Sequence, residues 1–73
     1  MPHVVIKMYP GTSEEQKKEL VTAVTNSFIN ILNKPESTIS VAIEEIDSAE
    51  WMNKVYEPEI RPIIEKLYKK PGY

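Results

Sequence analysis

The chain has 73 residues, of which 41% are hydrophobic and 27% charged, with a net charge of −2 and no cysteine. A chain of this length forms one small domain and buries only about 60–65% of its unfolded surface. The absence of cysteine excludes disulfides and thiolate metal sites, and the single histidine leaves only carboxylates as metal ligands. We therefore expect one domain over residues 1–73 that binds no metal or cofactor and is stabilised by self-association.

Charge and hydropathy also limit the partners of the chain. The acidic balance gives nucleic-acid binding little electrostatic support. No apolar stretch approaches the ~20 residues of a membrane span, and no signal-peptide pattern opens the sequence. The expected protein is soluble and cytoplasmic, with no nucleic-acid or membrane partner.

Residues 1–9 predict the first strand, because the β-branched run Val4–Ile6 is closed by a Pro10-Gly11 turn. Pro2 follows Met1 directly, and removal of Met1 would leave a secondary amine at the start of this strand. An α-amino group has a pKa near ~8 in free peptides, and apolar burial lowers that pKa. Such an amine is a candidate general base, although a Met-Pro start also arises by chance in about one chain in twenty.

A helix is predicted from Ser13 to about residue 32. Ser13 and Gln16 have the spacing of a capping box, and Asn33-Lys34-Pro35 ends the helical pattern. Apolar residues recur at helical spacing and are expected to face the core: Leu20, Val24, Phe28, Ile31 and Leu32.

Residues 39–46 predict a second strand that carries Ile39, Val41 and Ile43 on one face. A strand, a helix and a second strand form a βαβ unit with parallel strands. The fold class is thus α/β (α+β), built on a single βαβ unit. Pro2 should lie at the edge of the sheet where Ile39 and Ser40 enter it.

The remaining residues predict a short helical turn over 47–52, capped by Asp47 or Ser48, and a C-terminal helix. Pro58 and Pro62 are expected to mark the start of that helix, which ends at residues 69–72. Two strands are too few to stand alone. We therefore expect a dimer whose sheet has four strands, with the C-terminal segment or further subunits covering the open face.

Five features together resemble the tautomerase superfamily, in its 4-oxalocrotonate tautomerase-like form. They are the Met1-Pro2 start, Gly11 before the capping box with Glu15-Gln16-Lys17, Pro35 after the helix, a second strand that ends at Glu45-Ile46, and an aromatic residue at Trp51. The resemblance runs from Pro2 to about Trp51. The longer, helical tail resembles the dimeric branch of the family, which implies a homodimer in preference to a hexamer.

The resemblance implies a keto–enol tautomerase, an isomerase that acts on a small 2-keto acid or its enol or dienol. It gives the general-base role to the amine of Pro2 and the aromatic wall of the pocket to Trp51. Thr12 and Ser40 occupy positions where typical members carry arginines that bind substrate. Arg61, the single arginine, is the candidate substitute for carboxylate binding, and backbone N–H groups near Thr12 and Ser40 are the alternative.

Other interpretations stay open for the same residues. A lone tryptophan is often a core or interface anchor, an arginine near a helix start is often solvated, and His3 suits a structural role. The chain could also be a non-catalytic oligomeric module with an incidental proline. Dehalogenase or decarboxylase chemistry on the same scaffold is a further alternative, and the sequence leaves the natural substrate open.

Overall fold

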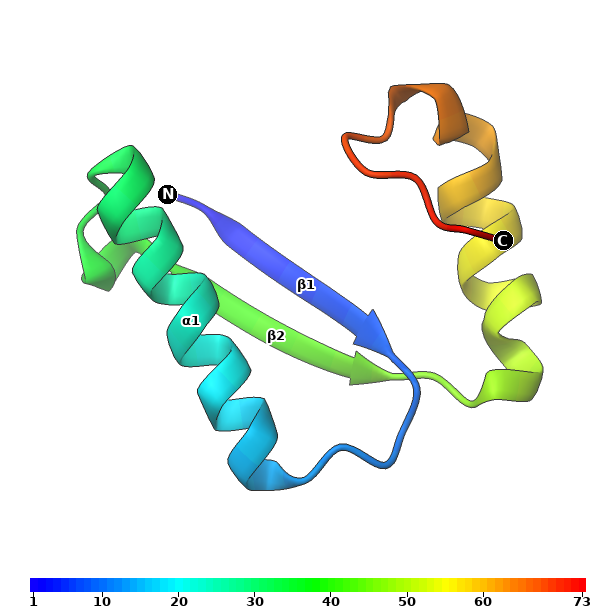
Figure 1. Ribbon diagram of the computed structural model, residues 1–73, viewed down its shortest axis with the longest axis horizontal. Coiled ribbons are helices and arrows are strands. Elements are labelled where there is room, and N and C mark those ends of the chain that lie inside the picture. The colour runs from blue at the N-terminus through cyan, green and yellow to red at the C-terminus, as the bar shows by residue number, and fades with distance from the viewer.

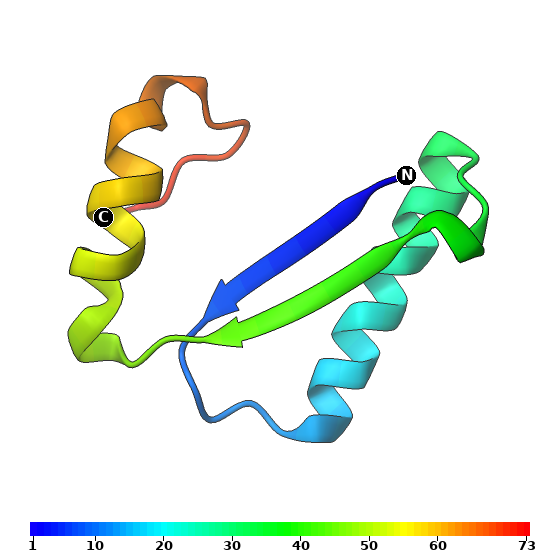
Figure 2. The same ribbon diagram turned by 180° about the vertical axis from the view of Figure 1, so that it is seen from behind.

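The computed structural model describes residues 1–73 as a βαβ unit followed by a helical C-terminal arm (Figure 1). Strand β1 (His3–Met8) leads into helix α1 (Glu14–Leu32), and a short 3-10 turn (Glu36–Thr38) precedes strand β2 (Ser40–Glu45). The arm, residues 47–73, leaves the far end of β2 and stands apart from α1 in both ribbon views (Figures 1 and 2). The predicted parallel βαβ unit with a C-terminal helix is confirmed.

The two strands pair in parallel over their full length, from His3 opposite Ser40 to Met8 opposite Glu45. A further hydrogen bond precedes this ladder, in which the Ser40 amide donates to the Pro2 carbonyl at 3.2 Å. Pro2 therefore lies where β2 begins, as the sequence predicts.

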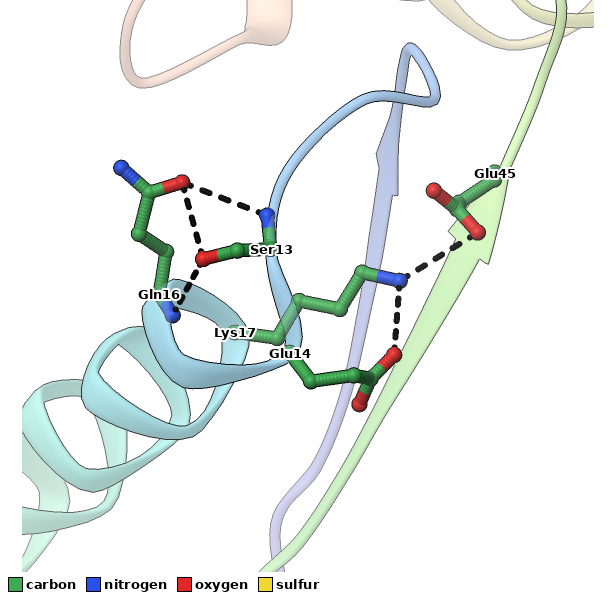
Figure 3. Close-up of polar contacts among 5 residues, drawn as sticks. All are labelled: Ser13, Glu14, Gln16, Lys17 and Glu45. Carbon is green, nitrogen blue, oxygen red and sulfur yellow. Dashed lines mark hydrogen bonds and ion pairs between the residues drawn. The ribbon is translucent and has the colours of Figure 1, made fainter.

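Helix α1 begins and ends where its capping residues predict. The Ser13 hydroxyl accepts a hydrogen bond from the Gln16 amide at 3.1 Å, and the Gln16 side chain accepts one from the Ser13 amide (Figure 3). At the other end Asn33 adopts a left-handed conformation, with φ of 55°, and its amide donates to the Ile29 carbonyl. Both devices satisfy backbone groups that the helix leaves unpaired.

Helix α1 covers one face of the sheet and leaves the other open. Val21 of the helix lines a shallow groove together with Val41 and Ile43 of β2. Lys17 in the first turn contacts both Glu14 and Glu45 at 3.3 Å, which joins the helix to the end of β2 (Figure 3). The opposite face, here called the outer face, carries the alternate residues of each strand.

One residue of the chain, Val55, is buried, with 5% of its surface exposed. The prediction that the whole apolar stripe of α1 is core is therefore wrong for a single protomer. Val24 and Phe28 are half-buried, but Leu20, Leu32 and especially Ile31, at 77%, are exposed. The reason is geometric: two strands are narrower than the stripe, so they cover only part of it.

The C-terminal arm consists of helical turns that begin earlier than the prolines predict. A turn over Ser48–Glu50 leads directly into a π-helix over Met52–Ile60, and a 3-10 segment follows over Arg61–Lys66. Pro58 lies inside the π-helix, so its placement at a helix start is wrong. In an α-helix its ring would clash with the carbonyl four residues earlier, and the wider π turn relieves that clash.

The predicted cap before the arm is only partly correct. Asp47 occupies the N-cap position of the first turn, and its backbone carbonyl accepts from the Glu50 amide at 2.9 Å. Its side chain makes no capping hydrogen bond. None of the helices is long and apolar enough to cross a bilayer.

Candidate active site

Pro2 is half-buried at the start of β1, and its carbonyl is held by the Ser40 amide. Met1 precedes it and is 97% exposed. While Met1 is attached, the nitrogen of Pro2 belongs to a tertiary amide and has no basicity. Any base at this position therefore depends on removal of an accessible residue.

Ser40 lies beside Pro2, and its hydroxyl oxygen is 2.6 Å from Nδ1 of His3. This contact follows from the strand register, which sets His3 directly opposite Ser40 on the outer face. Pro2, His3 and Ser40 thus form one cluster at the start of the sheet. The sequence pattern placed Pro2 and Ser40 together but gave His3 only a structural role.

Trp51 lies beyond the opposite end of the sheet, where β2 has ended and the arm begins (Figure 1). Tyr9 meets the indole ring edge-on at a centroid distance of 5.3 Å, and the indole N–H donates to the Tyr73 hydroxyl at 2.9 Å. Six residues of strand separate the two ends by roughly 20 Å. One protomer therefore does not bring Trp51 to Pro2.

Thr12 and Arg61 also lie away from Pro2. Thr12 is half-buried in the loop between β1 and α1, which leaves the same end of the sheet as the arm (Figure 1). Arg61 is exposed in the arm, where its Nε–H donates to Glu57 at 2.8 Å and its guanidinium lies 5.4 Å from the Tyr56 ring centre. The hydrogen bond to Glu57 raises the pKa of Arg61, so this side chain is a permanent cation.

The surface of a single protomer has four shallow hollows, and none of the predicted site residues lines any of them. One of them lies between α1 and β2, and the other three are formed mainly by residues of α1. A substrate pocket around Pro2 would thus need walls that one protomer does not supply. No cluster of carboxylates and histidine suited to a metal ion is present.

An exposed ion pair joins the arm to the outer face of the sheet. Nζ of Lys7 lies 2.7 and 2.6 Å from the two carboxylate oxygens of Glu59, and 3.9 Å from the Glu44 carboxylate. The hydrogen bond to Glu59 raises the pKa of Lys7, with smaller charge contributions from Glu59 and Glu44. This ion pair and the contact between Tyr9 and Trp51 both link the arm to β1 and the residue that follows it.

Replacing Glu59 by glutamine is expected to loosen the arm, because Lys7 then loses its charged partner. Amide hydrogen exchange should accelerate in residues 47–73 while α1 keeps its protection. Since the pKa of Lys7 is raised, its contribution is fully present below the ordinary lysine value of 10.5 and is lost only as the pH rises through the raised pKa. The wild-type arm should therefore stay protected throughout the neutral range.

The matched control is Glu65→Gln, which removes the ion pair between Lys70 and Glu65 within the arm itself. Equal exchange rates in the Glu59 and Glu65 variants would show that Lys7 does not hold the arm.

A comparison with known families matches residues 2–55 to the family described as "Tautomerase enzyme". The chain is 37% identical over 73 residues to a probable tautomerase of Xylella fastidiosa, which covers all of this chain and 89% of that protein. It is 40% identical over 74 residues to tautomerase PptA of Shigella sonnei, with coverage of 100% and 97%. The chain belongs to the tautomerase family, and this membership supports an isomerase activity of the tautomerase type.

Solved structures agree with this assignment. DmpI from Helicobacter pylori superposes with a TM-score of 0.62 at 38% identity, over 64% of this chain and 79% of that one. YwhB, described as a homologue of 4-oxalocrotonate tautomerase, gives a TM-score of 0.61 at 39% identity, over 63% and 75%. Residues 56–73, most of the arm, lie beyond the stretch that matches the family.

Proposed function

We propose that this chain is a keto–enol tautomerase that acts on a small 2-keto acid or its enol or dienol. The amine of Pro2, released by removal of Met1, is the general base. The observation that carries the proposal is the position of Pro2, half-buried at the start of β1 and paired with Ser40 inside the family-matched stretch. The names of the two curated relatives described above, both tautomerases, support the same type of chemistry.

The reaction needs one group that can accept a proton and return it elsewhere. A neutral amine accepts the proton of the enol hydroxyl, and the resulting ammonium delivers it to the neighbouring carbon. No cofactor enters this transfer, because both bonds change at the substrate and the amine alone. Apolar surroundings disfavour the charged form of a secondary amine and so lower its pKa. An amine that is neutral at physiological pH can act as a general base.

We further propose that residues 1–73 act as a single domain and that the site is completed in a homodimer. Trp51 and Thr12 lie at the end of the sheet opposite Pro2, and Arg61 lies within the arm, so a second copy would have to bring them beside Pro2. The exposed apolar residues and the two-stranded sheet with free edges support such an association. In a symmetric dimer each chain then contributes to both sites.

In this arrangement Trp51 forms the apolar wall, Thr12 and Ser40 offer hydroxyl groups, and Arg61 binds the substrate carboxylate. Arg61→Ala should raise KM for a carboxylate substrate by about 10- to 150-fold, the effect of losing a hydrogen bond to a charged group. KM for an uncharged enol of similar shape should change much less, since only the charged pair is lost. Steady-state kinetics on the two substrates measures both values.

Equal losses for both substrates would show that Arg61 supports the fold. Unchanged kinetics would leave it as a surface residue paired with Glu57.

The proposed function is tested by N-terminal mass analysis of the native protein, followed by an enol-ketonisation assay over a small panel of keto acids. We expect a mass that lacks Met1 and measurable ketonisation of an aryl enolpyruvate. A protein that retains Met1 and ketonises none of the panel would instead be a non-catalytic module.

A further inference from the structure

The closest side-chain hydrogen bond to the proposed base is the one between His3 and Ser40. Nδ1 of His3 and Oγ of Ser40 are 2.6 Å apart, and both side chains are exposed on the outer face. His3 is the next residue after Pro2, and the Ser40 amide donates to the Pro2 carbonyl at 3.2 Å. The pair therefore flanks Pro2, because His3 follows it in the chain and the Ser40 amide is bonded to its carbonyl.

At this separation a single hydrogen lies between nitrogen and oxygen, and it can belong to either atom. If Nδ1 carries the hydrogen, the ring donates to Oγ, and the hydroxyl hydrogen of Ser40 is free to point at a ligand. If Nδ1 carries no hydrogen, the Ser40 hydroxyl donates its hydrogen to the ring. The hydroxyl oxygen can then only accept a hydrogen bond from the ligand. Protonated imidazole carries hydrogen on both nitrogens, so it enforces the first arrangement.

We propose that His3 is a positioning residue that holds the Ser40 hydroxyl as a hydrogen-bond donor to the enolate oxygen of the substrate. Loss of the His3 proton then weakens catalysis. This inference rests on the proposed function, because the enolate arises only when the Pro2 amine acts as base. A donor aimed at the atom where charge develops is a major source of rate enhancement in enzymes.

The transfer from the enol hydroxyl to the carbon neither gains nor loses a proton. The neutral Pro2 amine takes the hydrogen of the enol hydroxyl and becomes an ammonium, which leaves a negative charge on the substrate oxygen. The Ser40 hydroxyl donates to that oxygen without transferring its hydrogen. The ammonium then gives its proton to the carbon as the carbonyl forms, so His3 and Ser40 end as they began.

Other charged groups near His3 are already engaged or lie on the preceding loop. Lys7 and Glu44 share the outer face but lie four residues further along each strand, and Lys7 is held by Glu59. Lys34 and Glu36 are exposed ahead of β2. His3 and the Pro2 amine are thus the groups at this edge of the sheet whose charge bears on the proposed step.

The test is the pH profile of kcat/KM for ketonisation by protein that lacks Met1. The wild-type profile of kcat/KM against pH should be bell-shaped. It should fall at low pH, where the Pro2 amine is protonated, and at high pH, where His3 has lost its proton. His3→Asn keeps a neutral N–H donor, so it should lose the descending limb and keep the ascending one. Ser40→Ala should lower kcat by about 10-fold, while Ser37→Ala, an exposed serine of the same segment, should not.

A readout independent of turnover accompanies the kinetics. The His3 ring titration followed by NMR should have its midpoint at one of the two limbs of the profile, and circular dichroism should show that each variant is folded. A descending limb that persists in His3→Asn, a midpoint elsewhere, or an unchanged kcat in Ser40→Ala overturns the inference while Pro2 keeps its role. A processed wild type without activity, or one matched by Pro2→Ala, overturns the proposed function itself.

Discussion

Replacing Pro2 by alanine is expected to lower kcat/KM for enol ketonisation by about 100-fold or more, the usual consequence of losing a general base. Alanine would also be left with a free amine after Met1 removal, but this amine is primary and its backbone is less constrained. Proline fixes φ and holds the nitrogen rigidly at the start of β1. The loss should therefore appear mainly in kcat, with little change in KM.

The matched control is Pro35→Ala, which changes an exposed proline whose carbonyl accepts from the Thr38 amide and hydroxyl. Alanine retains that carbonyl, so this variant should keep wild-type rates. Equal kcat/KM for wild type and Pro2→Ala would remove Pro2 from the mechanism.

The unfolding temperature is expected to rise steeply with protein concentration. One residue of 73 is buried in a single protomer, and large apolar side chains such as Ile31 and Leu32 stay in water. Such a protomer lacks the core that stabilises a domain, so folding and association should occur together. For a folded dimer in equilibrium with unfolded chains, each tenfold increase in concentration adds about 1.4 kcal/mol of stability per dimer.

Thermal unfolding over about a hundredfold range of concentration, with sedimentation to give the assembly size, measures this coupling. A folded monomer at micromolar concentration, with an unfolding temperature that does not depend on concentration, would contradict the proposed dimer. A hexamer would retain the coupling and correct only the number of subunits.

The parts of the fold that local sequence determines were predictable. The Ser13 capping box and the Asn33 termination signal set both ends of α1, and alternation with β-branched residues set the two strands. Pro58 misled the interpretation of the arm, because a proline signals a helix boundary only when the helix is of α type. A π turn that accommodates a proline has no comparable local signature.

The candidate site was predictable only where the strand register determines it. Pro2 and Ser40 were placed together, since a parallel βαβ unit brings the starts of both strands to one edge. The His3–Ser40 hydrogen bond needs the exact pairing of residues, and the Lys7–Glu59 ion pair joins positions 52 residues apart. The position of Trp51 relative to Pro2 could not be predicted from local sequence either, because it depends on the path of the whole chain.

The central claim, that the Pro2 amine is the base, is tested most directly by comparing two preparations of the same chain. One has Met1 removed, as verified by mass, and the other retains it, and both are checked for the same secondary structure and assembly size. We predict that the processed protein ketonises an aryl enolpyruvate and that the Met1-bearing protein does not, because its Pro2 nitrogen is an amide. Equal rates in the two preparations would contradict the claim.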